Sequence, residues 1–253
     1  MEILGYILFI FVGIFFGLFG SGGSVLMLPI FLDIFDMNED TARSYSWLLV
    51  FLISFIGSIK NIKDKKLHLE KRLFFFIIPT LIFTYLSTIY LNPIIDKHFE
   101  EIFFKIVFSF VVFCASIALF RPIPTKIYNS VIMLVLMGSG IGFLSGFLGI
   151  GGGFIIVPAL ILFAGIDIKN AAPIALFAIS LNTLLAICVK ITVFDFQYEY
   201  DKIAYFFFIG LIGVIIGMKI APRLDLKTTK KIYSISLLLL SLIIFFSQII
   251  TFL

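Results

Sequence analysis

Long apolar runs recur along the chain and are separated by short polar loops. Many of the runs hold 17 or more residues, and about 20 helical residues cross the hydrocarbon layer of a bilayer. Runs such as 73–91 and 235–253 do not alternate between apolar and polar residues, as the strands of a membrane barrel would. The pattern therefore predicts an all-α polytopic membrane protein. Ten helical segments are expected, over residues 3–20, 25–35, 45–59, 73–91, 102–120, 127–149, 154–165, 171–189, 203–221 and 232–253.

Two of these segments, 25–35 and 154–165, have only 11 and 12 residues and are too short to cross the bilayer as helices. Each follows a glycine-rich stretch directly. The stretches are Gly20-Ser21-Gly22-Gly23-Ser24 and Gly149-Ile150-Gly151-Gly152-Gly153. Each therefore predicts an interrupted element that consists of a helix, a glycine break and a short helix.

The two glycine stretches belong to an internal duplication. The run Gly17-Leu-Phe-Gly-Ser-Gly-Gly-Ser-Val-Leu-Met-Leu-Pro29 recurs as Gly146-Phe-Leu-Gly-Ile-Gly-Gly-Gly-Phe-Ile-Ile-Val-Pro158, and equivalent residues differ by 129 positions. We therefore expect two repeats of about four helical segments each, over residues 1–121 and 122–253. Each repeat opens with a glycine-interrupted helix.

Two topologies are compatible with this pattern, and the charged loops distinguish them. If each interrupted element crosses the membrane once, the repeats are parallel and the loops 60–72 and 219–231 lie on opposite sides. If each element returns to the side it entered from, the repeats are inverted and both loops share one side. These loops carry six and five Lys or Arg residues, and basic loops gather in the cytoplasm. The charges favour inverted repeats, an arrangement common among transporters.

Composition supports the membrane assignment and argues against several partners. Hydrophobic residues make up 61% of the 253 residues and charged residues 13%, against about 45–50% and about 25% in soluble domains. The net charge of +4 comes from basic residues in short loops, so topology explains it and we expect a lipid bilayer but no nucleic acid as a partner. Cys114 and Cys188 lie far apart in apolar segments, and we expect both to be small buried hydrophobic residues.

A glycine break inside the membrane suits an anion. The first N–H groups of the helix that follows have no intrahelical partner, and that helix end carries partial positive charge. Glycine lets the backbone approach a ligand closely, and the hydroxyls of Ser21 and Ser24 can donate further hydrogen bonds. We therefore predict an anion site without a fixed cation. Its expected residues are Gly20, Ser21, Gly22, Gly23, Ser24, Gly149, Gly151, Gly152 and Gly153.

A few other polar residues within the apolar segments are candidates for the same site. Asn182 either donates to a bound oxyanion or hydrogen-bonds a neighbouring helix. Ser46, Ser54 and Thr183 are further candidates, although such hydroxyls more often bond their own helix backbone. Arg43 suits oxyanions through its guanidinium. Its position at the start of a helix is also typical of an arginine that extends to the interface, and we expect this interfacial role.

Outside these residues the sequence offers little catalytic chemistry. His68 and His98 fall in loops, and the apolar segments contain no cluster of His, Asp or Glu. Neither glycine stretch has the Gly-Lys-Ser/Thr of a P-loop or the spacing of a dinucleotide site. We expect no enzyme activity, no metal and no cofactor. The outer glycines Gly13, Gly142 and Gly213 have the small-xxx-small spacing of helix packing.

The duplicated Gly-x-Gly-Gly element and the segment Ala171-Ala-Pro-Ile-Ala-Leu-Phe-Ala-Ile-Ser-Leu-Asn182 resemble the sulfite exporter TauE/SafE family, also called the toluenesulfonate uptake permease family. The resemblance covers the whole chain, and the second stretch matches better, because Ser24 replaces a glycine in the first. It implies transport of sulfur-containing or other organic anions, such as sulfite, sulfonates or sulfoacetate, across the inner membrane. It also implies about eight spans if each interrupted element counts as one.

These observations predict a secondary transporter of small anions that works by alternating access between two repeats. A passive anion channel with the same site is the alternative, and a membrane scaffold without flux is a third hypothesis. We expect a multi-pass protein of the cell inner membrane, and a homo-oligomer is compatible with the sequence. The anion, the direction of transport and the coupling ion are left open.

Overall fold

The chain is all-helical in the part that the computed structural model describes, namely residues 2–20, 22–68, 70–94, 101–120, 130–149, 151–166 and 168–252. No strand occurs among these residues. The α-helices are α1 (Glu2–Phe19), α2 (Ser24–Pro29), α3 (Glu39–Lys63), α4 (Phe74–Leu86), α6 (Glu101–Phe120), α7 (Val131–Leu148), α8 (Gly153–Leu162), α9 (Ile168–Phe194), α10 (Tyr200–Ile220) and α11 (Leu226–Phe252). Short π-helical segments, η1 (Ile30–Ile34) and η3 (Ser87–Leu91), extend α2 and α4, and 3-10 turns η2 (Lys71–Leu73) and η4 (Ala221–Arg223) lie in loops.

Six of the described helices are long and apolar enough to cross a membrane, which identifies a multi-pass membrane protein. The segments 25–35 and 154–165 form short helices as predicted, since α2 with η1 ends at Ile34 and α8 ends at Leu162. The spans found by length and hydropathy are Glu39–Lys63, Lys71–Ile94, Val131–Leu148, Asn170–Phe194, Tyr200–Ile220 and Lys227–Phe246.

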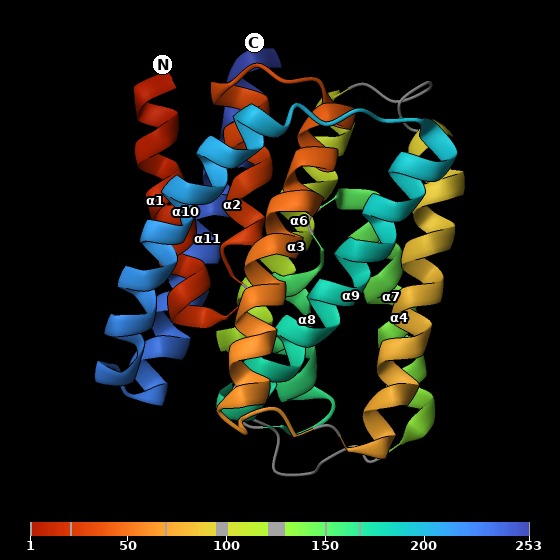
Figure 1. Ribbon diagram of the computed structural model, residues 1–253, viewed down its shortest axis with the longest axis vertical. Coiled ribbons are helices and arrows are strands. Elements are labelled where there is room, and N and C mark those ends of the chain that lie inside the picture. The colour runs from red at the N-terminus through yellow and green to blue at the C-terminus, as the bar shows by residue number, and fades with distance from the viewer. Residues whose placement is uncertain are drawn as a thin grey trace.

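Each glycine break joins two helices that run in opposite directions (Figure 1). In that view α1 descends from the end where both chain termini lie, and α2 with η1 returns to the same end. From the opposite end α7 ascends, and α8 returns there. The turn after α3 and the turn η4 also lie at that opposite end, which we call the basic end because it carries the loops 60–72 and 219–231. The other end, which carries Asp33, Asp36, Glu39 and Asp40, is the acidic end.

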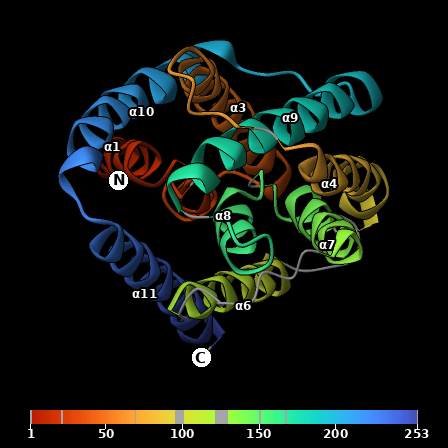
Figure 2. The same ribbon diagram turned by 90° about the horizontal axis from the view of Figure 1, so that it is seen from below.

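The principal helix pairs join the two halves of the sequence (Figure 2). α1 packs along α10 and α7 packs along α4, while α3 packs on α9 and α6 on α11. Outer glycines bring the first two pairs close together, because a Cβ at Gly13 would overlap the carbonyl oxygen of Gly210 and one at Gly142 would overlap that of Thr80. The packing role expected for these glycines is thereby confirmed.

The two cysteines differ from the prediction. Cys114 on α6 and Cys188 on α9 are both exposed. Cys114 lines a cavity together with residues of α7 and α8, and lipid can cover an exposed small apolar side chain as well as protein does. Position in an apolar segment therefore predicted contact with an apolar medium but not burial in the protein.

Candidate functional site

The first glycine break lines a cavity of about 540 Å³ between α1, α3, α9 and α10. Gly17 contributes from the end of α1, Gly20 from the break and Ala172 from the start of α9. Most of the remaining wall is apolar, including Phe16 and Ile53. The cavity thus brings residues of both halves around the first break.

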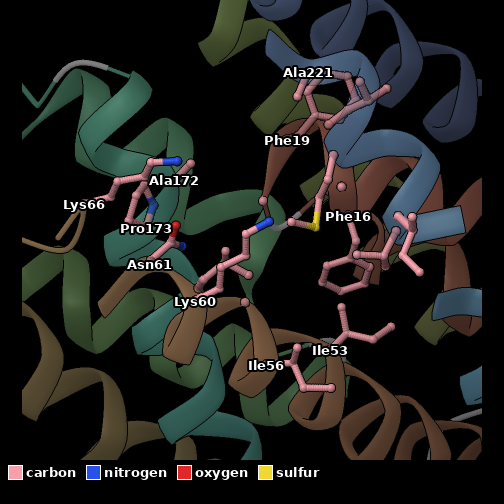
Figure 3. Close-up of a pocket in the computed structure, with 18 of the residues that line it drawn as sticks. Phe16, Phe19, Ile53, Ile56, Lys60, Asn61, Lys66, Ala172, Pro173 and Ala221 are labelled. Carbon is pink, nitrogen blue, oxygen red and sulfur yellow. The ribbon is translucent and has the colours of Figure 1, made fainter. Parts of the chain in front are cut away.

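Polar residues of the cavity come from the basic end of α3 and the turn that follows (Figure 3). In this view the Lys60 side chain extends toward the middle of the lining residues, and Asn61 lies near Ala172 and Pro173. Lys66 forms an ion pair with Asp64 at 3.4 Å, whereas Lys60 has no ion-pair partner among the described residues. Lys60 is therefore a cation at the mouth of the cavity that is available to a dissolved anion.

The second glycine break has a backbone that only glycine adopts easily. Gly149, Gly151 and Gly152 have φ angles of 72°, 68° and 72°, a region that costs other residues about 1 kcal/mol or more. They place the start of α8 beside α7, and no described side chain caps α8 at Gly152. The N–H of Ile155 bonds to the carbonyl oxygen of Gly152 at 3.0 Å, and no described capping side chain serves the N–H groups before it.

Arg43 lies on this second break and is fully buried. Its alkyl chain packs where a Cβ of Gly149 would lie. Its Nε donates to the carbonyl oxygen of Glu39 at 3.3 Å and its Nη1 to Oδ1 of Asn92 at 3.5 Å. A carboxylate oxygen of Glu39 is 4.0 Å from Nη2. The expected interfacial arginine is therefore wrong, because the missing side chain of Gly149 leaves room for Arg43 between the helices.

The first break shows the repeat-equivalent contact. A Cβ at Gly20, which has φ 77°, would lie 3.1 Å from the Cβ of Ala172. The offset of 129 pairs Gly20 with Gly149 and Arg43 with Ala172. Each break therefore contacts the helix start of the other half at the same position. Only the second contact includes a cation, which differs from the expectation of a site without one.

Other glycines of the first break are covered by protein. A Cβ at Gly22 would lie 2.5 Å from the Tyr233 ring, and one at Gly23 would overlap Phe16 and the backbone of Val12. Ser24 begins α2 and is fully buried. The candidate Ser21 lies outside the described residues.

The candidate hydroxyls divide into two groups. Thr183 donates to the carbonyl oxygen of Ile179 at 2.7 Å and Ser54 to that of Phe51 at 3.2 Å, so both bond their own helices. The methyl group of Thr183 nevertheless lies only 2.6 Å from where a Cβ of Gly151 would be. The hydroxyl of Ser46 is buried and has no hydrogen-bond partner among the described residues.

Asn182 has the most unusual environment of the predicted residues. Its side chain is 1% exposed, and neither its amide nitrogen nor its oxygen has a hydrogen-bond partner in the described part of the chain. An unsatisfied buried amide costs about 1–3 kcal/mol per group. The second alternative for Asn182, a hydrogen bond to a neighbouring helix, is therefore not what the structure contains.

Sequence reasoning missed Ser145 and Trp47. The Ser145 hydroxyl lies 3.3 Å from where a Cβ of Gly152 would be, so it faces the start of α8. It is buried without a hydrogen-bond partner among the described residues, and so is Nε1 of Trp47. The offset sets Ser145 against Phe16 and Trp47 against Leu176, but only the structure shows that these two residues line the cavity.

At the acidic end, ion pairs and aromatic rings fill the space between α3 and α9. Lys190 is 3% exposed and pairs with Asp40, and its ammonium lies 5.0 Å from the centroid of the Phe194 ring. The Tyr45 hydroxyl accepts from the backbone N–H of Glu199 at 3.3 Å. In the same loop, burial raises the pKa of Tyr198 well above its ordinary value, so this hydroxyl stays neutral. These contacts join α3 to α9 and to the loop that follows α9 at the acidic end.

Among the described residues, no three His, Cys, Asp or Glu side chains gather in a group that could hold a metal ion. The arrangement instead offers hydrogen-bond donors and cations, which bind anions.

Comparison with known proteins agrees with this picture. The family model described as sulfite exporter TauE/SafE matches residues 6–244. The chain is also 29% identical over 240 residues to a protein of Methanocaldococcus jannaschii named probable membrane transporter protein, with 88% of this chain and 87% of that protein covered. No solved structure matches. The chain therefore belongs to the sulfite exporter TauE/SafE family, whose members are membrane transporters and not enzymes.

Proposed function

We propose that the protein is a secondary transporter of small, sulfur-containing or organic anions such as sulfite or sulfonates. Its substrate path runs from the cavity at the first glycine break to the second break. The observation that carries this proposal is the pair of contacts Gly20–Ala172 and Gly149–Arg43, of which one borders an open cavity and the other is buried. Alternating access requires a substrate path that is open to one side of the membrane while it is closed to the other side.

Inverted repeats over residues 1–121 and 122–253 supply the alternation. The support is the direction of the two hairpins in Figure 1 and the interlocking helix pairs, since α1 on α10 and α7 on α4 are equivalent under the sequence duplication. Both basic loops lie at one end, which faces the cytoplasm under the positive-inside rule. The protein in this orientation is open to the cytoplasm, and the membrane is the cell inner membrane.

The anion is recognised by the glycine breaks and the polar residues around them. Support comes from the uncapped start of α8 and from Asn182 and Ser46, whose buried polar atoms have no partner among the described residues. Lys60 attracts the anion to the cavity mouth. The family name supports sulfite as a substrate class.

Counterflow in proteoliposomes tests this function. Vesicles loaded with unlabelled methanesulfonate or sulfite are diluted into labelled anion, and a carrier is expected to accumulate label transiently because internal substrate returns the site to the outside. A conductance far above carrier turnover, without counterflow, would instead establish the passive channel. Absence of any flux with all anions tested would favour the scaffold and reject both.

A further inference from the structure

We propose that the anion is bound at the second glycine break alone, in a closed site formed by Arg43, Trp47, Ser145 and Asn182, and that its ligand is a singly charged oxyanion. This inference rests on the proposed anion transport and assigns its central site. The cavity at the first break serves as the vestibule.

The internal duplication identifies this site. Four residues that line the cavity are Phe16, Ile53, Ala172 and Leu176. Adding or subtracting the offset of 129 converts them to Ser145, Asn182, Arg43 and Trp47, respectively. The substitutions all go in one direction, from an apolar residue around the cavity to a polar donor around the second break. At these four positions the two repeats have therefore diverged, with apolar residues beside the cavity and polar donors at the equivalent positions.

The polar residues are buried and three of them have unused donors. Trp47 is 0%, Ser145 1% and Asn182 1% exposed. Trp47 Nε1, Ser145 Oγ and Asn182 Nδ2 have no hydrogen-bond partner among the described residues. A buried donor without a partner is costly in a membrane protein. A bound acceptor would satisfy such donors, and the offset of 129 assigns Trp47 and Asn182 to the same site as Ser145.

Two contacts place Ser145 and Arg43 at the glycine break. Ser145 Oγ lies 3.3 Å from where a Cβ of Gly152 would be, at the start of the ten-residue helix α8. The Arg43 side chain occupies the space that a side chain at Gly149 would take. At this break, Ser145 of the second repeat therefore supplies a hydrogen-bond donor, and Arg43 of the first repeat supplies a cation.

The donor set also defines the charge of the ligand. The guanidinium, indole N–H, hydroxyl and amide N–H groups all donate, so the ligand must present several acceptor oxygens. Arg43 supplies one positive charge, and a carboxylate oxygen of Glu39 lies 4.0 Å from its Nη2. A monoanion can take the place of this carboxylate, whereas a dianion would retain an uncompensated charge in a buried site. A sulfonate fits these conditions and sulfate does not.

The single tryptophan of the chain provides the test, because Trp47 is one of the proposed contacts. Purified full-length protein is titrated with methanesulfonate while Trp47 emission is recorded, and sulfate serves as the dianion. We expect a saturable emission change with methanesulfonate and a much weaker response to sulfate. Ser145→Ala and Asn182→Leu should each weaken binding severalfold, and Arg43→Gln about tenfold or more. Lys105→Gln, which removes another ion-paired cation of the acidic end, should bind normally.

Each outcome decides the assignment. Arg43→Lys and the melting temperature of each variant show whether a loss reflects misfolding, and Ser145→Ala remains informative if the Arg43 variants do not fold. A silent Trp47 in wild-type protein that performs counterflow would overturn the site while leaving the transport function intact. Saturable binding without any flux would retain the site and reject transport. Equal binding of wild type, Ser145→Ala and Asn182→Leu would also overturn the proposal.

Discussion

The side chain of Arg43 lies against the α-carbon of Gly149, and the two residues come from different halves of the chain. Their repeat equivalents, Ala172 and Gly20, make the corresponding contact beside the cavity. The duplicated contact thus differs between the two breaks. At the second break it involves the buried cation Arg43, and at the first break it involves Ala172, which lines the cavity. The proposed division of the two breaks into a vestibule and a binding site rests on this difference in side chain.

Replacing Gly149 with alanine is expected to destabilise the protein by about 2 kcal/mol or more. The new Cβ would overlap Arg43, and φ of 72° is unfavourable for alanine. Gly140→Ala is the matched control, because a Cβ at Gly140 meets nothing within 4 Å and alanine favours a helix. Thermal unfolding in detergent compares them. Equal melting temperatures for the two variants would show that the Gly149 contact carries no packing constraint.

Substituting Lys60 with glutamine should raise the KM for anion uptake from the basic end and leave the maximal rate nearly unchanged. Lys60 lines the cavity mouth without an ion-pair partner among the described residues, so it concentrates anions before they reach the break. Lys63→Gln alters a neighbouring exposed lysine that does not line the cavity. Initial uptake rates at low and high salt distinguish the variants, and an equal KM in both would contradict a capture role.

Asp40→Asn should lower the free energy of unfolding by about 2 kcal/mol. The change leaves the Lys190 ammonium, whose side chain is 4% exposed, buried without its carboxylate partner. The partial exposure of Asp40, 37%, moderates the loss. The exposed pair Asp64–Lys66 supplies a control, since Asp64→Asn should change stability by about 0.5 kcal/mol or less. Chemical denaturation measures both. A larger loss of stability in Asp64→Asn than in Asp40→Asn would contradict the prediction that the buried Lys190 pair contributes more than the exposed Lys66 pair.

Cysteines introduced singly at Lys63 and Lys227 should react with an impermeant thiol reagent from the same side of the membrane. Both positions are exposed and belong to the basic loops. The measurement uses a chain from which Cys114 and Cys188 have been removed, because both are exposed. Labelling from opposite faces would rule out the inverted arrangement.

Much of the helical pattern could be predicted from hydropathy, because lipid selects for continuous apolar helices. The short helices α2 and α8 were also predictable, since glycine stretches precede them and their lengths are too small for a span. The exposure of Cys114 was not, because an apolar segment does not reveal which of its faces meets lipid.

The site was predicted only in part. The glycine breaks and Asn182 stand out in the sequence as interruptions of an apolar pattern, but the burial of Arg43 depends on its contact with Gly149, 106 positions away. Trp47 and Ser145 are unremarkable residues within their own helices. Their equivalence to cavity-lining residues became informative only when the structure showed which positions surround the cavity.

Uptake of labelled methanesulfonate by proteoliposomes that contain Gly151→Val, compared with Gly140→Val, tests the role of the glycine break most directly. A side chain at Gly151 would lie 2.6 Å from the Thr183 methyl group, whereas Gly140 faces open space. We predict that Gly151→Val loses uptake while its insertion and reconstitution match those of Gly140→Val, which transports like wild type. Wild-type uptake by a folded Gly151→Val protein would contradict the account.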